Sequence, residues 1–245
     1  MSKKIIWKKN YKDRDLTFCL QIHSDESLAQ LCLKRLRKIY PKCNIICIIE
    51  KVNRKRIKYF KRYNVDIFYG EELYKYKKNS SVVKRMFDVF LLYDSDYFFK
   101  IDTDTQFIKR FRKLPVSDCS FGHKRRAQKT RIIQAGCLGY TRGVIEDITK
   151  SDFLQIMNHN NDYSWIRPGN VLGVDTEKYF ISKDIVSFDM ISAYAVKARG
   201  FPIVSYDEIY SVWIKNLKEK DIIEIYNGDY SVIHPCIERI ERCQK

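Results

Sequence analysis

The sequence lacks the features that would divide it into parts or carry it across a membrane. Glycine is scarce, with 9 residues among 245, and there is no Gly/Ser linker, internal repeat or break in composition. No apolar run approaches the ~20 residues of a membrane-spanning helix, and no long apolar stretch follows the charged start of the chain. We therefore expect one domain over residues 1–245, in a cytoplasmic protein without a signal peptide or transmembrane segment.

Regular cysteine patterns are also missing. The eight cysteines form no Cys-x-x-Cys pair and no regular framework, and most of them lie inside apolar segments. This usage favours reduced thiols in a cytosolic protein over a disulfide scaffold. The sequence contains no zinc finger, aromatic RNP motif or recognition-helix signature.

Acidic residues are outnumbered by basic ones, 30 to 46, which gives a formal net charge of +16. Such a charge favours an anionic partner, which includes nucleotide phosphates, nucleic acid and an acidic membrane face. The basic residues are spread over several segments, so no specific nucleic-acid partner is expected, while peripheral membrane contact stays open. The 45% of hydrophobic residues supply a core large enough for independent folding.

Strand-like and helix-like apolar patterns alternate through the first hundred residues, as βαβ units require. They predict strands over 16–22, 44–50, 65–69 and 97–101, and helices over 24–40, 54–63 and 80–93. Beyond residue 107 the pattern loosens. It predicts strands over 118–123, 132–140, 202–206 and 230–234, and helices over 141–150, with the Thr141 side chain as its cap, and over 189–199.

Position singles out one of the three Asp-x-Asp triplets. The triplets at 13–15 and 94–96 lie in a charged lead-in and in a turn, whereas Asp102 and Asp104 end the apolar strand 97–101. Open α/β sheets bind ligands at the carboxyl ends of their strands. Alternate residues of an extended segment point to one side, so both carboxylates can hold a divalent cation that bridges to phosphate oxygens.

The motif Asp102-Thr103-Asp104, placed after three βα units, resembles the metal motif of GT-A glycosyltransferases, which use nucleotide sugars. The resemblance implies a GT-A-like (Rossmann-like) α/β fold with a mixed, mostly parallel sheet flanked by helices. It implies that Asp104 ligates Mn²⁺ or Mg²⁺ and that Asp102 reaches the metal or the ribose. His234, in a late strand, matches the further metal ligand of many members, and imidazole suits Mn²⁺.

The same resemblance implies a set of residues that bind the donor. Gly136 lets the backbone approach the donor sugar closely, because glycine has no side chain to obstruct it. Gln21 and His23, at the end of the first strand, begin the nucleotide pocket. Lys84, on the helix before the acidic strand, contacts the phosphates as a point charge. These residues join Asp102, Thr103 and Asp104 in the predicted cofactor-binding set.

Asp189 is the predicted catalytic residue. It opens the helix 189–199, which Gly200 closes, and inverting family members place at such a helix start the base that deprotonates the acceptor hydroxyl. An aspartate there can equally cap its helix or complement the helix dipole. Phe188 stands where another acidic residue often precedes the base, and Asp184 is the reserve candidate.

These observations predict a metal-dependent glycosyltransferase, either a hexosyl- or a pentosyltransferase. It would move a sugar from a nucleoside-diphosphate sugar to a hydroxyl of a glycan or glycoconjugate in an inverting displacement, with retention as the alternative. A metal-dependent nucleotidyltransferase or nuclease would also place paired carboxylates beside basic residues. A noncatalytic nucleic-acid-binding protein would also be strongly basic.

Overall fold

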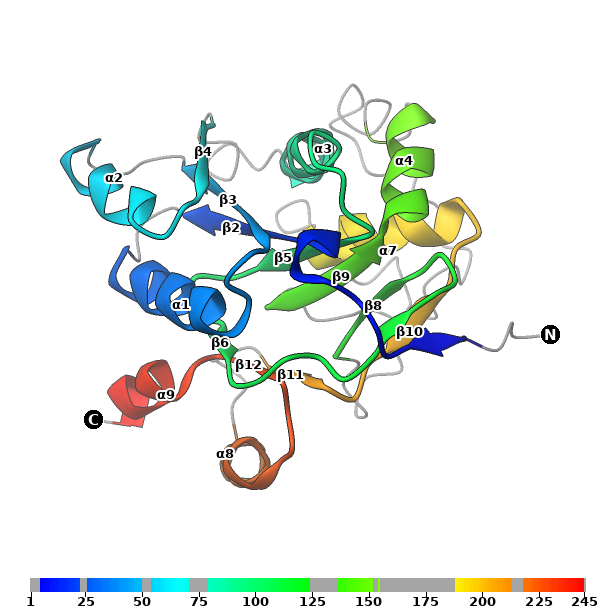
Figure 1. Ribbon diagram of the computed structural model, residues 1–245. Coiled ribbons are helices and arrows are strands. Elements are labelled where there is room, and N and C mark those ends of the chain that lie inside the picture. The colour runs from blue at the N-terminus through cyan, green and yellow to red at the C-terminus, as the bar shows by residue number, and fades with distance from the viewer. Residues whose placement is uncertain are drawn as a thin grey trace.

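The computed structural model describes residues 5–22, 26–49, 54–70, 79–123, 136–151, 154, 188–212 and 218–244. Its centre is a seven-stranded sheet in the order β10-β8-β9-β5-β2-β3-β4 (Figure 1). In this sheet β9 is antiparallel to both of its neighbours, and all other neighbouring strands are parallel. The predicted mixed, mostly parallel sheet is therefore confirmed. Its strands are β2 (Leu16–Ile22), β3 (Asn44–Ile49), β4 (Asp66–Tyr69), β5 (Tyr97–Ile101), β8 (Ser120–Gly122), β9 (Cys137–Thr141) and β10 (Ile203–Ser205).

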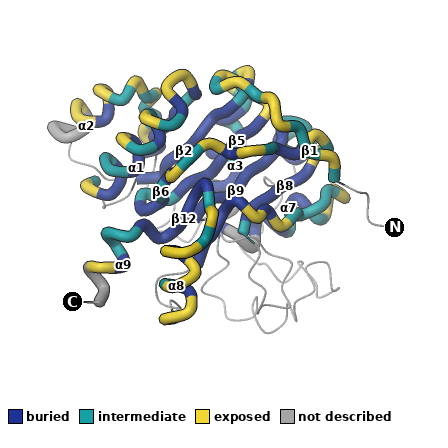
Figure 2. The backbone as a smooth tube through the Cα atoms, turned by 60° about the horizontal axis from the view of Figure 1, so that its bottom comes forward, coloured by how far each residue is buried: buried dark blue, intermediate teal, exposed yellow. Residues whose placement is uncertain are grey.

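Helices cover both faces of the large sheet. One face packs against α1 (Glu26–Ile39) and α2 (Arg54–Lys61), and the other packs against α3 (Asn79–Phe90), α4 (Arg142–Lys150) and α7 (Phe188–Ala198). Figure 2 shows the strands as the buried middle layer of the molecule. All seven residues of β2 are buried, since this strand has a neighbour on either side and helices on both faces.

A second, three-stranded sheet lies beside the first and has the order β11-β12-β6. Its strands are β11 (Ile209–Ser211), β12 (Val232–His234) and β6 (Gln106–Phe107), and α8 (Glu219–Asn227) and α9 (Ile237–Gln244) pack on it (Figure 1). The sequence patterns predicted β12 alone among these elements. The two residues of β6 are too few to show a periodicity. The analysis also missed β11, α8 and α9.

The buried carboxylate of Glu208 ties this small sheet to the rest of the molecule. Its side chain has no exposed surface, and it accepts hydrogen bonds from the Arg112 backbone N–H (2.8 Å), the Ser231 hydroxyl (2.8 Å) and the Tyr206 hydroxyl (2.9 Å). Glu208 therefore fixes the start of β11 against both the 107–115 segment and β12.

The remaining pair of short strands, β1 (Trp7–Lys8) and β7 (Leu114–Pro115), is antiparallel.

Two predictions about helix ends have different outcomes. Gly200 follows α7 with a φ of +79°, a left-handed conformation that glycine adopts without strain, so its role as the terminator of this helix is confirmed. Thr141 stands at the N-cap position of α4, but its hydroxyl makes no capping bond. It donates instead to Asp118 Oδ1 at 2.9 Å, so the predicted side-chain cap is wrong.

The thiols behave as the cysteine spacing predicted. Seven cysteines have described side chains, and all seven are free and buried. Burial raises the pKa of Cys19 to about 12 and that of Cys236 to about 11. In the described part of the chain, no helix is long and apolar enough to cross a membrane.

Arg37 joins the end of α1 to the turn that precedes β4. Its Nε donates to the Tyr63 carbonyl (3.0 Å), its Nη2 to the Asn64 carbonyl (2.8 Å), and its Nη1 to the carbonyls of Pro41 and Cys43 (2.9 Å each). Asn64 has a positive φ of 52°, and the bond from Arg37 helps to hold this conformation. The planar fork of the guanidinium makes all these bonds from a single side chain.

We expect Arg37→Lys to lower the free energy of unfolding by about 2 kcal/mol, because an ammonium group cannot reach both sets of carbonyls. Urea denaturation followed by circular dichroism measures this loss. Lys38→Met, on the exposed side of the same helix, is the matched control and should change stability little. Equal stabilities for the two variants would contradict the structural role of Arg37.

Candidate metal centre

Asp102 and Asp104 leave β5 in a tight turn. The Thr105 backbone N–H donates to the Asp102 carbonyl at 3.1 Å, and the Asp102 N–H and the Thr105 hydroxyl both donate to the Gly136 carbonyl, at 3.0 and 2.7 Å. The predicted extended segment is therefore wrong in its geometry. The turn still brings the two carboxylates together at the carboxyl edge of the sheet.

His234 reaches this turn from the small sheet. It ends β12, where it pairs with Ser211 of β11, and its ring lies against Gly136. A Cβ atom on Gly136 would stand 2.2 Å from the imidazole and 2.6 Å from the Ser211 hydroxyl, so any larger residue would displace both. The close approach that glycine permits here is thus to His234. Contact of Gly136 with a donor sugar stays a prediction.

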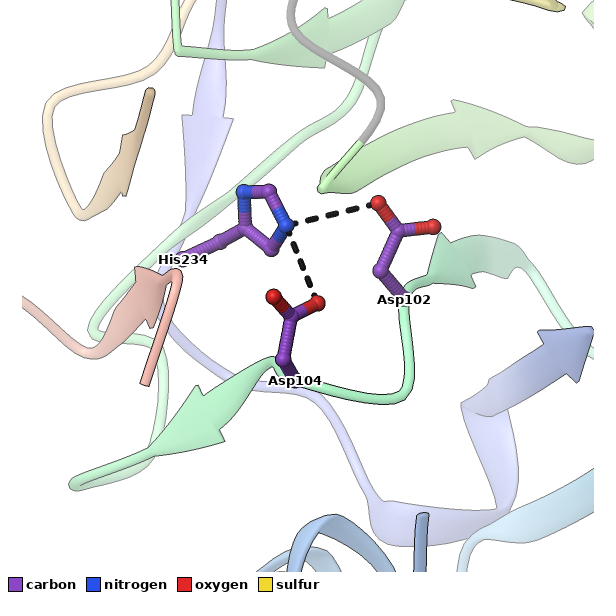
Figure 3. Close-up of side chains that lie close together, drawn as sticks. All are labelled: Asp102, Asp104 and His234. Carbon is purple, nitrogen blue, oxygen red and sulfur yellow. Dashed lines mark ion pairs between the residues drawn. The ribbon is translucent and has the colours of Figure 1, made fainter. Parts of the chain in front are cut away.

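The three side chains converge on one point (Figure 3). His234 Nε2 lies 3.1 Å from Asp104 Oδ1 and 3.4 Å from Asp102 Oδ2, and one ligand atom of each residue lies within 4.8 Å of the others. The other ring nitrogen, Nδ1, is 3.1 Å from the Ser211 hydroxyl. A second partner of this kind fixes the orientation of a metal-binding histidine and presents Nε2 to the metal.

Asp104 and His234 shift each other's pKa through their hydrogen bond and their charges, against the effect of burial. Burial alone would raise the pKa of Asp104, but the hydrogen bond and charge of His234, together with Arg239, lower it to about 2. Burial would lower the pKa of His234, but the bond to Asp104 and the charges of Asp104 and Asp102 raise it above the ordinary value. The cluster therefore holds an ionised carboxylate next to an imidazole that retains a proton to higher pH than usual.

Two cations flank the cluster, and sequence analysis did not assign either to it. Lys100 Nζ is bonded to Asp102 Oδ1, and Arg239 Nη1 donates to Asp104 Oδ2 at 2.8 Å. Lys100 is 4% exposed and its ammonium lies 5.3 Å from the centre of the Phe188 ring. Lys100 could have been found from the sequence, because a charged residue in an apolar strand, two positions before Asp102, is unusual. No local pattern pointed to Arg239, because its contact with Asp104 depends on the position of α9.

The helix α9 is held in place from both sides. Glu238 accepts from Arg35 of α1, with Nη1 at 3.0 Å from Oε2, and this bond lowers the pKa of Glu238. The Cys236 backbone N–H donates to the Asp104 carbonyl at 2.7 Å. The Arg239 guanidinium therefore approaches the carboxylate from a fixed direction.

The donor set fits a divalent metal ion. Carboxylate oxygens suit Mg²⁺ and Mn²⁺, and an imidazole nitrogen beside them favours a transition metal such as Mn²⁺. Among the described residues, Asp102, Asp104 and His234 are the group of this composition that is close enough to share one ion. The predicted metal ligands are thus together, while their binding of an ion and the identity of that ion stay predictions.

Three other predicted donor-binding residues lie on the strand next to β5, in the turn between the two aspartates and on α3. Gln21, near the end of β2, is buried on the strand next to β5, and Thr103 is half-buried in the turn between the two aspartates. Lys84 is bonded at 2.6 Å to Asp88 on a partly exposed side of α3. Its neighbour Arg85 instead turns toward the carboxyl edge, where its guanidinium lies against Gly70.

The remaining predicted residues fall partly or wholly outside the described part of the chain. His23 and Asp184 lie outside it. The backbone of Asp189 is described as the second residue of α7, while its side chain is not. Phe188, directly before it, contacts Lys100, so the start of α7 lies next to the ion pair formed by Lys100 and Asp102. The role of Asp189 as a base stays a prediction.

Comparison with known proteins shows the fold. No protein-family model matches the chain, and no curated protein matches it either. Mouse xyloside xylosyltransferase 1 superposes with a TM-score of 0.55 and 9% identity, over 91% of this chain and 98% of its own. The galactosyltransferase LgtC, in complex with donor and acceptor sugar analogues, gives 0.53 and 9%, over 90% of this chain and 87% of its own.

An active-site mutant of LgtC gives a TM-score of 0.51 and 10% identity over the same shares of the two chains. These similarities cover nearly the whole of this chain at very low identity, so they concern its fold. The chain has the GT-A fold of glycosyltransferases, as its Asp-x-Asp motif predicted, and the candidate metal centre lies at the carboxyl edge of the sheet.

We expect the affinity for Mn²⁺ to rise with pH up to the elevated pKa of His234, by about tenfold per pH unit where the imidazole is protonated, because the ion must displace that proton. Without metal, protonated His234 stabilises the fold. This contribution is complete at a pH below the pKa that His234 has in the unfolded chain, and it is lost as the pH rises through the higher pKa that His234 has in the folded protein. Isothermal titration calorimetry at several pH values measures the affinity. His234→Gln should bind Mn²⁺ more weakly and lose this dependence, and an unchanged pH profile would exclude His234 as a ligand.

Proposed function

We propose that this protein is a metal-dependent glycosyltransferase that moves a sugar from a nucleoside-diphosphate sugar to a hydroxyl acceptor on a glycan or glycoconjugate. The observation that carries the proposal is the convergence of Asp102, Asp104 and His234 at the carboxyl edge of a GT-A fold. The proposal takes residues 1–245 as one glycosyltransferase domain.

The two aspartates and the histidine would hold Mn²⁺ or Mg²⁺. The ion, when bound, would neutralise charge on the diphosphate leaving group. Burial strengthens this arrangement, because Asp104 and His234 have side chains that are 5% and 9% exposed and are weakly screened by water. Ser211 would keep the imidazole oriented, and the Gly136 backbone would leave room for its ring.

Other residues of the chain would bind the donor. Gln21 and His23 would contact the nucleotide at the end of β2, with Thr103 and Gly136 next to the metal ligands. Lys84 was predicted to contact the phosphates, and Arg85 is better supported by its orientation toward the sheet edge. Binding energy from the nucleotide would serve to position the sugar for attack.

Asp189 would take the proton of the acceptor hydroxyl in an inverting displacement. Its support is positional, because the first turn of α7 lies beside Lys100 and hence beside the metal ligand Asp102. A base on one side of the donor sugar and the leaving diphosphate on the other is the arrangement that a single displacement requires. A cap of α7 is the competing role for this residue.

The function is tested by incubating the protein with Mn²⁺ and a panel of nucleotide sugars and measuring release of nucleoside diphosphate. We expect turnover with at least one donor, and a loss of at least about 100-fold in kcat for Asp104→Asn, since an amide cannot replace the ionised ligand. Asp94→Asn, in another Asp-x-Asp triplet, is the matched control and should retain activity. Metal-dependent cleavage of nucleic acid, without turnover of any nucleotide sugar, would favour the nuclease instead.

The role of Asp189 predicts a separation between catalysis and binding. Asp189→Asn should reduce kcat by about 100-fold or more while the affinity for the donor stays within about threefold, because only proton transfer is lost. Steady-state kinetics and calorimetry measure the two quantities, and Asp184→Asn provides the comparison. A variant that keeps its kcat but unfolds more easily would identify Asp189 as a helix cap.

A further inference from the structure

Each metal-binding carboxylate has two oxygens in different surroundings. The inner oxygens, Asp102 Oδ2 and Asp104 Oδ1, face His234 Nε2 at 3.4 and 3.1 Å (Figure 3). The outer oxygens, Asp102 Oδ1 and Asp104 Oδ2, are bonded to Lys100 and Arg239. The two cations come from different elements, β5 and α9, so both carboxylates are paired with a cation independently.

The formal charges of Asp102, Asp104, Lys100 and Arg239 cancel before any ion binds. Two carboxylates are balanced by one ammonium and one guanidinium when His234 is neutral. A divalent ion on the inner oxygens would leave the cluster with two positive charges in surroundings where Lys100 and Asp104 are screened little. A diphosphate would restore the balance, since it carries at least two negative charges.

We propose that Lys100 and Arg239 are counter-cations that make retention of the metal ion depend on the diphosphate. This inference rests on the proposed function. The two cations repel the ion, and their ion pairs with Asp102 and Asp104 draw negative charge away from the oxygens that would bind it. Both effects weaken binding of the ion alone. Once the ion is bound, the same two charges attract the diphosphate. By thermodynamic linkage, the diphosphate then strengthens binding of the ion by the factor by which the ion strengthens binding of the diphosphate.

A purely structural role would have the opposite effect on the metal. If Lys100 and Arg239 only held the carboxylates in position, their loss would disorder the ligands and weaken the binding of every ligand. Without Lys100, Asp102, whose side chain is 37% exposed, keeps its contacts with water and with His234, and Asp104 keeps its contact with His234 without Arg239. We therefore expect the loss of repulsion to outweigh the loss of these ion pairs, so that removal of either cation improves binding of the ion alone.

The test is calorimetric titration of Mn²⁺ alone into the protein and into Lys100→Met and Arg239→Met. We expect each variant to bind Mn²⁺ about tenfold more tightly than the unaltered protein, because a nearby like charge is gone. The affinity for inorganic pyrophosphate at saturating Mn²⁺ should fall by about tenfold in the same variants. Lys150→Met and Arg199→Met remove a lysine and an arginine from surface ion pairs with Glu146 and Asp147 and should change neither affinity.

Opposite changes in the two affinities would support the inference, with circular dichroism confirming that the variants fold. Weaker or unchanged binding of Mn²⁺ by both folded variants would overturn it while leaving the metal centre intact. Failure of the unaltered protein and of every variant to bind Mn²⁺, with or without pyrophosphate, would overturn the metal centre itself and the counter-cation role with it. If one variant fails to fold, the other decides the question alone.

Discussion

The structure of the site depends on the contact between the His234 imidazole and the two carboxylates of the turn that joins the large sheet to the small one. Asp102 follows β5 of the large sheet and Asp104 precedes β6 of the small one, whereas His234 ends β12, which pairs with β6. This pairing brings His234 beside the turn. Buried polar contacts, above all those of Glu208, fix the small sheet further, because an unsatisfied carboxylate there would be costly.

A balance of charge accompanies this geometry. A strongly basic protein with a formal charge of +16 would repel a metal ion, yet Asp102 and Asp104 gather at one edge of the sheet, each paired with a cation. The positive surplus elsewhere in the chain favours the approach of anions over long range, whereas the local pairs set the charge of the candidate site. Attraction at a distance and the charge of the site thus come from different residues.

The sequence revealed the large sheet because its central strands are long, apolar and punctuated by amphipathic helices, as β2 and β5 illustrate. It revealed the acidic pair because these residues end an apolar strand, although a turn and not an extended segment unites them. It could not reveal β6, whose two residues are too few for a periodic pattern, and β11 was also missed. The pairing of Arg239 with Asp104 was also hidden, since contacts between distant elements follow from packing and leave no local pattern.

The rates at which thiol reagents modify the buried cysteines would report the stability of different parts of the fold. A thiol reagent attacks the thiolate form, and burial makes that form rare in the native state by raising the cysteine pKa. Modification must therefore await local or global opening, so its rate at each cysteine reports the stability of that region. Cys236, whose backbone bonds to Asp104, would record the opening of the metal centre, while Cys19 in β2 would record that of the central sheet.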